Sequence, residues 1–176
     1  MNIAVYLGAS EGNAPAFKMA ATELGTWIGC AGHRLVYGGS KCGLMGVLAG
    51  SVLDAGGEVI GVEPQFFVDD CLQFDDITEL IVTDDMAQRK AKMIELADAF
   101  IAFPGGTGTL EEISEVMSKL SLGHLDAPCV IYNLGGYYEG LKMLLDRMVE
   151  VGLSTPDRQR GIHFVESLDD IRTVLG

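Results

Sequence analysis

The chain has 176 residues, of which 48% are hydrophobic and 21% are charged, so it fits a single domain with one buried core. Its formal net charge of −13 argues against a nucleic-acid partner, because proteins that bind nucleic acids usually carry a basic stripe. No stretch approaches the roughly 18 apolar residues that span a membrane, and the sequence therefore predicts no membrane partner.

Four cysteines, Cys30, Cys42, Cys71 and Cys129, lie far apart along the chain. Their spacing does not suit zinc ligation, and the three histidines are scattered as well. We therefore expect reduced thiols, a cytoplasmic location and no bound metal.

Short apolar runs alternate with amphipathic stretches along the whole chain. The apolar runs predict strands at Ile3–Leu7, Leu35–Tyr37, Val59–Val62, Leu80–Val82, Ala99–Phe103, Val130–Tyr132 and Phe164–Val165. The amphipathic stretches predict helices at Pro15–Ala31, Gly43–Ala55, Met86–Ala97, Leu110–Leu122, Tyr137–Val151 and Leu168–Leu175. The segment Gln65–Ile77 fits either a short helix or an irregular loop. This alternation predicts an α/β fold, a doubly wound parallel sheet with helices on both faces, in a single domain over residues 1–176.

Ligands of such folds bind beyond the carboxyl ends of the strands. The sequence places three segments rich in Gly, Ser and Thr there, at residues 8–12, 38–46 and 104–112. Ser10 in the first segment and Gly39 in the second are candidate ligand-binding residues. The second segment contains no Walker A motif, and its glycines are equally compatible with close packing of a helix on a strand.

The third segment, Pro104–Glu112, is the most informative. Its glycines let the backbone approach a ligand, and the helix that follows directs free N–H groups and a positive dipole end at the same point. We therefore predict a phosphate-binding loop formed by Gly105, Gly106, Thr107, Gly108 and Thr109. The alternative is structural, because Thr109 and Glu112 have the T-x-x-E spacing of a capping box, which needs no ligand.

The helix predicted after the fourth strand begins with Asp85 as its N-cap. Met86, Arg89 and Met93 share one face of this helix, and an arginine between methionines is not typical of a solvated surface. In a chain with only 12 Lys and Arg residues, Arg89 and Lys90 form a candidate anion clamp. The alternative is an ordinary surface arginine.

Three glutamates, Glu111, Glu112 and Glu115, lie near the start of the helix after the predicted phosphate loop. All three can stabilise the helix by facing the positive end of its dipole. Only Glu112 lies beside the loop, where its carboxylate could reach a sugar carbon.

Three motifs together resemble the Lonely Guy family: YGGxxxGLMG at Tyr37–Gly46, MxxRKxxM at Met86–Met93 and PGGxGTxxE at Pro104–Glu112. Members of this family are cytokinin riboside 5′-monophosphate phosphoribohydrolases, often mislabelled as lysine decarboxylases. The resemblance runs from the first strand to the segment 135–138. The chain departs from the family pattern at Phe17, Ser40, Lys119 and Leu125–Pro128, positions that bear on the preferred base.

The resemblance implies a Rossmann-like fold and a homodimer with sites near the subunit interface, without a cofactor. It implies hydrolysis of adenine-type nucleoside 5′-monophosphates, namely cytokinin riboside monophosphates or AMP, to the free base and ribose 5-phosphate. Arg89 and Glu112 match the family's catalytic pair, and Gly105–Thr109 matches its phosphate-binding loop. We expect Lys90 and Met86 to bind the same small-molecule nucleotide.

Two other functions remain open on this fold, a non-catalytic nucleotide sensor and a molybdenum-cofactor carrier. Both would use the same loops without hydrolysis. A nicotinamide-dependent oxidoreductase is disfavoured, because no ribose-binding acid is identifiable after the first strand and turn.

Overall fold

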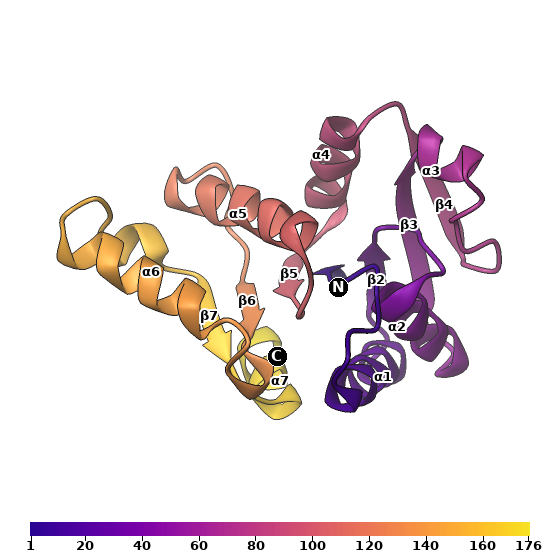
Figure 1. Ribbon diagram of the computed structural model, residues 1–176, viewed down its shortest axis with the longest axis horizontal. Coiled ribbons are helices and arrows are strands. Elements are labelled where there is room, and N and C mark those ends of the chain that lie inside the picture. The colour runs from indigo at the N-terminus through magenta and orange to yellow at the C-terminus, as the bar shows by residue number, and fades with distance from the viewer.

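Seven parallel strands form one sheet in the order β4-β3-β2-β1-β5-β6-β7 (Figure 1). The computed structural model describes residues 1–176. The strands are β1 Asn2–Tyr6, β2 Arg34–Tyr37, β3 Glu58–Pro64, β4 Glu79–Thr83, β5 Ala99–Ala102, β6 Cys129–Tyr132 and β7 Ile162–Val165. The predicted doubly wound α/β fold is confirmed, and the order of the strands reverses between β1 and β5.

Helices cover both faces of the sheet (Figure 1). One face packs against α1 Pro15–Cys30, α2 Gly43–Asp54 and α7 Leu168–Leu175, and the other against α4 Met86–Leu96, α5 Thr107–Ser121 and α6 Glu139–Glu150. The remaining elements are α3 Gln65–Asp69 and two 3-10 helices, η1 Leu134–Gly136 and η2 Pro156–Gln159. None of the helices is both long and apolar enough to cross a membrane.

The central strands are apolar along their length because both of their faces are covered. Strands β5 and β6 are buried at every position. Alternate side chains of β1 belong to opposite cores, with Ile3 and Val5 on the α1 side and Ala4 and Tyr6 on the α5 side. Continuous apolar runs in the sequence are therefore the signature of this buried parallel sheet.

Two helix starts differ from the sequence-based prediction, and one of them changes the interpretation of the site. Helix α5 begins at Thr107 rather than at Leu110, with Gly106 as its extended N-cap residue. Thr109 is therefore inside the first turn, and the capping box proposed for Thr109 and Glu112 is wrong. Helix α6 begins at Glu139 rather than at Tyr137, after the turn η1.

The structure also tests two further predictions, the N-cap of α4 and the conformation of the segment after β3. Asp85 caps α4 as predicted, because its carboxylate accepts a hydrogen bond from the backbone N–H of Gln88 at 2.8 Å. The segment Gln65–Ile77 combines both of the structures considered for it, since the short helix α3 is followed by irregular chain.

Candidate active site

The candidate site lies where the strand order reverses, at the carboxyl ends of β1 and β5. Tyr6 pairs with Ala102, so the two strands end side by side. The backbone N–H of Gly8 donates to the carbonyl of Pro104 at 3.3 Å, and this contact joins the loops that follow the two strands. A cavity of about 300 Å³ opens between these loops and helix α4. This is the position at which doubly wound sheets bind ligands.

One wall of the cavity is the amino end of helix α5, at Gly106–Thr109. No side chain caps this end of the helix, so its first N–H groups are available to a ligand. Gly105 permits a tight turn here, because a Cβ at this position would collide with Thr109 Oγ1 and lie 2.9 Å from Gly8 N. The free N–H groups and the positive end of the helix dipole together suit an anion such as phosphate.

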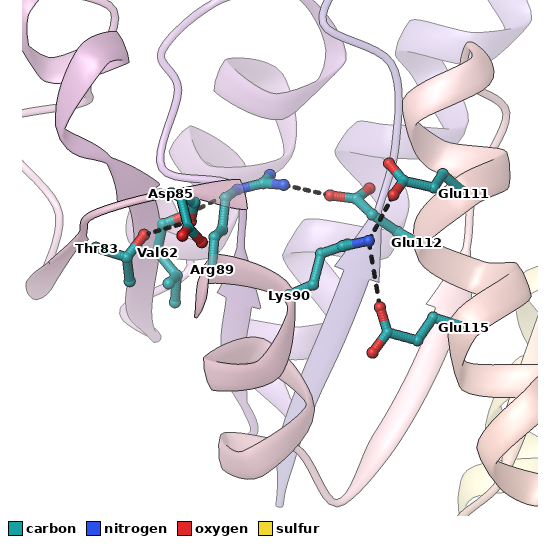
Figure 2. Close-up of polar contacts among 8 residues, drawn as sticks. All are labelled: Val62, Thr83, Asp85, Arg89, Lys90, Glu111, Glu112 and Glu115. Carbon is teal, nitrogen blue, oxygen red and sulfur yellow. Dashed lines mark hydrogen bonds and ion pairs between the residues drawn. The ribbon is translucent and has the colours of Figure 1, made fainter. Parts of the chain in front are cut away.

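Arg89 enters the cavity from the first turns of α4 and is only 7% exposed. Its Nε donates to the carbonyl oxygen of Val62 at 3.0 Å, and its Nη1 donates to the carboxylate of Glu112 (Figure 2). Its Nη2 lies against Gly38, where a Cβ would collide with it. These contacts fix the plane of the guanidinium, which a lysine could not reproduce. Arg89 is therefore a buried cation and not a surface charge.

Glu112 lies on α5 opposite Arg89, is 7% exposed and lines the same cavity. Burial raises the pKa of its carboxyl above the usual range, although the charge and the hydrogen bond of Arg89 act in the opposite direction. Removing either partner would leave the other charge buried and uncompensated, at a cost of about 3–5 kcal/mol. The arrangement places a carboxylate and a guanidinium beside an anion site, a combination suited to chemistry at the sugar of a nucleotide.

Lys90 lies outside the cavity, although it follows Arg89 directly in the sequence. Its Nζ contacts the carboxylates of Glu111 at 2.5 Å and Glu115 at 3.3 Å (Figure 2). The hydrogen bonds to these two glutamates raise the pKa of Lys90. Its ammonium group therefore bridges α4 and α5, and Lys90 is not among the residues that line the cavity.

The remaining predicted site residues are distributed around the cavity. Met86 lines it, together with Phe67 and Met45. Ser10 lines an adjoining hollow of about 450 Å³, which shares Gly8, Ala9 and Gly106 with the first cavity. Gly39 lies behind the cavity wall, against Glu63.

Sequence reasoning missed several residues of these two hollows. Tyr137 donates its hydroxyl hydrogen to the carbonyl of Gly105 at 2.5 Å, and its ring meets that of Phe17 edge-on at 5.8 Å between centroids. Phe67 belongs to the segment whose structure the sequence left open. The sequence held a signal for two of them, since Tyr137 lies within the family-like segment 135–138 and Phe17 is one of the positions where the chain departs from the family pattern.

No group of three or more His, Cys, Asp or Glu side chains is arranged to hold a metal ion. All four cysteines are free thiols.

Solved structures of similar shape include the molybdenum cofactor carrier protein of Chlamydomonas reinhardtii. It superposes with a TM-score of 0.73 over 98% of this chain and 96% of that one, at 21% sequence identity. The molybdenum cofactor binding protein of Rippkaea orientalis matches the same shares of the two chains with a TM-score of 0.68, also at 21% identity. At this level of identity the likeness concerns the fold alone.

Similarity at the sequence level is stronger. A family model described as "possible lysine decarboxylase" matches residues 45–175. The cytokinin riboside 5′-monophosphate phosphoribohydrolase LOG1 of Arabidopsis thaliana is 43% identical over 154 residues, 88% of this chain and 72% of that protein. The phosphoribohydrolase of the same name from Rhodococcoides fascians is 43% identical over 157 residues, 88% of this chain and 79% of that protein. This chain therefore belongs to the Lonely Guy (LOG) family.

Proposed function

We propose that this protein hydrolyses the N-glycosidic bond of adenine-type nucleoside 5′-monophosphates and releases the free base and ribose 5-phosphate. The observation that carries the proposal is the buried pair of Arg89 and Glu112, placed in one cavity with the uncapped amino end of α5. The names of the relatives from Arabidopsis thaliana and Rhodococcoides fascians support the same activity. Cytokinin riboside monophosphates are one group of substrates, and AMP, the substrate of an AMP nucleosidase, is the simplest member of the class.

Glu112 would act on the sugar. Cleavage of the N-glycosidic bond passes through a ribosyl cation, whose positive charge a nearby carboxylate stabilises. The bond between C1′ and the base nitrogen breaks, the electron pair leaves with the base, and the base takes up a proton from solvent water. A water oxygen then bonds to C1′, and Glu112 accepts the proton that this water loses.

Arg89 would keep this carboxylate in place and bind the substrate. Its Nη1 holds Glu112 while its Nε is fixed by Val62, so the orientation of the guanidinium does not depend on the ligand. Such preorganisation is what makes an electrostatic contribution to catalysis large.

The 5′-phosphate would bind at Gly105–Thr109, with its oxygens accepting hydrogen bonds from the N–H groups of α5. Binding energy from the phosphate would then orient the ribose beside Glu112. Met86 would contact the base side of the substrate, and Ser10 and Gly39 belong to the surrounding loops. We leave Lys90 out of this site, because its ammonium group is bound to Glu111 and Glu115.

A cofactor carrier or nucleotide sensor is the alternative on this fold. The likeness to molybdenum cofactor carriers is one of shape, at 21% identity. Burying an ion pair costs free energy because both charges lose their hydration, and a carrier has no need of a buried carboxylate opposite an arginine inside its cleft. The pair therefore favours hydrolysis.

The test of the proposed function is product analysis. Incubation with AMP and with N6-isopentenyl-AMP should yield free base and equimolar ribose 5-phosphate, separated by chromatography. Since the site offers no cluster of metal ligands, excess chelator should leave the rate unchanged. Intact nucleotides after prolonged incubation would favour the sensor or carrier, and loss of activity with chelator would reveal a metal requirement.

We also propose that the protein is a homodimer formed through helices α5 and α6. Helix α6 has no buried residue although it contains Leu, Met and Val, and its Met143 and Leu144 are 65% and 52% exposed. A hollow of about 600 Å³ lies between α5 and α6, lined by residues of both helices such as Leu110, Met117 and Leu145. An apolar surface of this kind on a chain of net charge −13 suits a second copy, whose matching face is equally apolar.

The matched pair of variants Met143→Glu and Met19→Glu tests this dimer. The two methionines are 65% and 63% exposed, but Met19 lies on α1 at the other face of the sheet. Light scattering should give about twice the chain mass of 18.8 kDa for the wild type and for Met19→Glu, and a single chain mass for Met143→Glu. A wild-type monomer, or a dimer in both variants, would contradict this interface.

We further propose a cytoplasmic location. The four cysteines are all unpaired, and the pKa of the buried Cys129 thiol is raised to about 12 by desolvation, which keeps it unreactive. Free thiols persist in compartments that are kept reducing.

A further inference from the structure

Glu63 is a buried carboxylic acid that the proposed hydrolysis does not use. It lies near the end of β3, directly after Val62, and is 1% exposed. Its Oε2 has no hydrogen-bond partner, and neither has the buried hydroxyl of Tyr37 on the neighbouring strand. Burying an ionised carboxylate without a partner is strongly unfavourable, so the residue calls for an explanation.

The position of Glu63 relative to the active site is defined by the turn Gly38–Gly39. A Cβ on Gly38 would collide with Arg89 Nη2, whereas a Cβ on Gly39 would lie 3.0 Å from Glu63 Oε2. The Nε of Arg89 is bound to the carbonyl of Val62, the residue before Glu63. Glu63 therefore lies behind the guanidinium of Arg89, on the other side of this turn from the cavity.

The protonation of Glu63 changes the charge of this buried region. Arg89 and Glu112 compensate each other, so an ionised Glu63 brings the three groups to a net charge of −1, and a protonated Glu63 leaves them neutral. Burial raises the pKa of Glu63 to about 7, while the charges of Arg89 and Lys41 act to lower it. Tyr37 is the other titratable group facing Glu63, and its pKa is raised by burial and by the Glu63 carboxylate, so it stays neutral.

We propose that Glu63 is a positioning residue of the active site, which acts through Arg89 and sets how strongly the cavity binds the phosphate of its ligand. Arg89 lines the same cavity as Gly106–Thr109, so its positive charge acts on an anion bound at the start of α5. When Glu63 is protonated, only Glu112 offsets that charge. When Glu63 is ionised, its negative charge behind the guanidinium, which makes no direct contact with it, offsets part of that attraction. The inference rests on the proposed function for the identity of the anion, a sugar 5-phosphate.

The protonation of Glu63 and the binding of the anion are linked equilibria, and this linkage gives the direction in which the affinity changes with pH. An ionised Glu63 weakens the binding of an anion, and by reciprocity a bound anion favours the protonated form of Glu63. Affinity for the phosphate ligand therefore falls as the pH rises through about 7, the pKa of Glu63. A glutamine at this position has the same shape and no charge to gain, so it removes the effect.

Calorimetric binding of ribose 5-phosphate between pH 6 and pH 8.5 tests the proposal with Glu63→Gln. The ratio of the wild-type Kd to the variant Kd should be near one at pH 6 and should rise to about threefold to tenfold at pH 8.5. The titration of the phosphate itself affects both proteins and cancels in this ratio. The control is Glu58→Gln at the exposed start of the same strand, where the ratio should stay near one. A ratio for Glu63→Gln that does not change with pH would overturn the proposal.

A measurement on the wild type alone keeps the proposal testable if Glu63→Gln fails to fold. At pH 8, where the phosphate of free ribose 5-phosphate is already fully ionised, binding should take up a fraction of a proton, seen by calorimetry in buffers of different ionisation enthalpy. No uptake, or no binding of ribose 5-phosphate, would overturn the role of Glu63. Binding with the expected proton uptake but without hydrolysis of any nucleotide would overturn only the proposed function.

Discussion

Replacing Glu112 with Gln should lower kcat for nucleotide hydrolysis by about 10²-fold or more, because the ribosyl cation loses the carboxylate that stabilises it. The amide keeps the shape of the side chain and can still accept a hydrogen bond from Arg89 Nη1. KM should therefore change less than kcat, since the phosphate site at Gly105–Thr109 is untouched. The measurement is steady-state kinetics with AMP or N6-isopentenyl-AMP, followed by release of free base.

The matched control is Glu115→Gln, one turn further along the same helix. Glu115 pairs with Lys90 and Lys119 outside the cavity and is partly exposed, so its loss should change kcat by no more than about twofold. Thermal unfolding of both variants separates an effect on chemistry from one on folding. Near-normal kcat in a folded Glu112→Gln protein would show that the proposed mechanism is wrong.

The parallel sheet could be predicted from the sequence because its central strands are buried on both faces. Such strands appear as continuous apolar runs, and segments such as Ala99–Phe103 can be recognised without knowledge of their neighbours. The regular spacing of helices between them then requires crossover connections, which fixes a parallel sheet. The strand order β4-β3-β2-β1-β5-β6-β7 depends on pairing between segments that are far apart in the sequence, and only the structure shows it.

The start of α5 could not be predicted from the sequence, because the helix propensities of its first residues favour a later start than the tertiary contacts do. Thr107 and Gly108 are poor helix formers, so the sequence places the start at Leu110. In the structure Thr109 packs against Gly105, and the backbone N–H of Gly8, in the loop after β1, donates to the carbonyl of Pro104 and holds the turn in place. The helix consequently begins earlier, and its free N–H groups point into the cavity.

The surroundings of Lys90 and Glu63 are formed by contacts between elements that are distant in the sequence. Lys90 follows Arg89, but successive residues of a helix differ by about 100° in direction, so the two point to different surroundings. Glu63 follows the apolar run Val59–Val62 near the end of β3, and a glutamate in such a position is ordinarily exposed. Only the approach of the turn Gly38–Gly39 buries its carboxyl behind Arg89.

The phosphate group should decide which substrates are cleaved. AMP should be hydrolysed with a kcat/KM about 10³-fold or more above that of adenosine, because two or three charge-assisted hydrogen bonds contribute roughly 1.5–3 kcal/mol each. The donors are the N–H groups at the start of α5, which no side chain of this protein caps. In a chain of net charge −13 the overall field repels an anion, so binding depends on these local groups.

The two substrates must be compared through kcat/KM, since the phosphate can act on binding or on the chemical step. Adding inorganic phosphate to the adenosine reaction provides a further control. If the phosphate serves only to close the site, the free anion should restore part of the rate. If its covalent link to the ribose is needed to hold C1′ beside Glu112, the free anion should restore little, which we expect because positioning of the sugar depends on that link. Equal cleavage of AMP and adenosine would contradict the anion site at Gly105–Thr109, and with it the assignment of this chain as a phosphoribohydrolase.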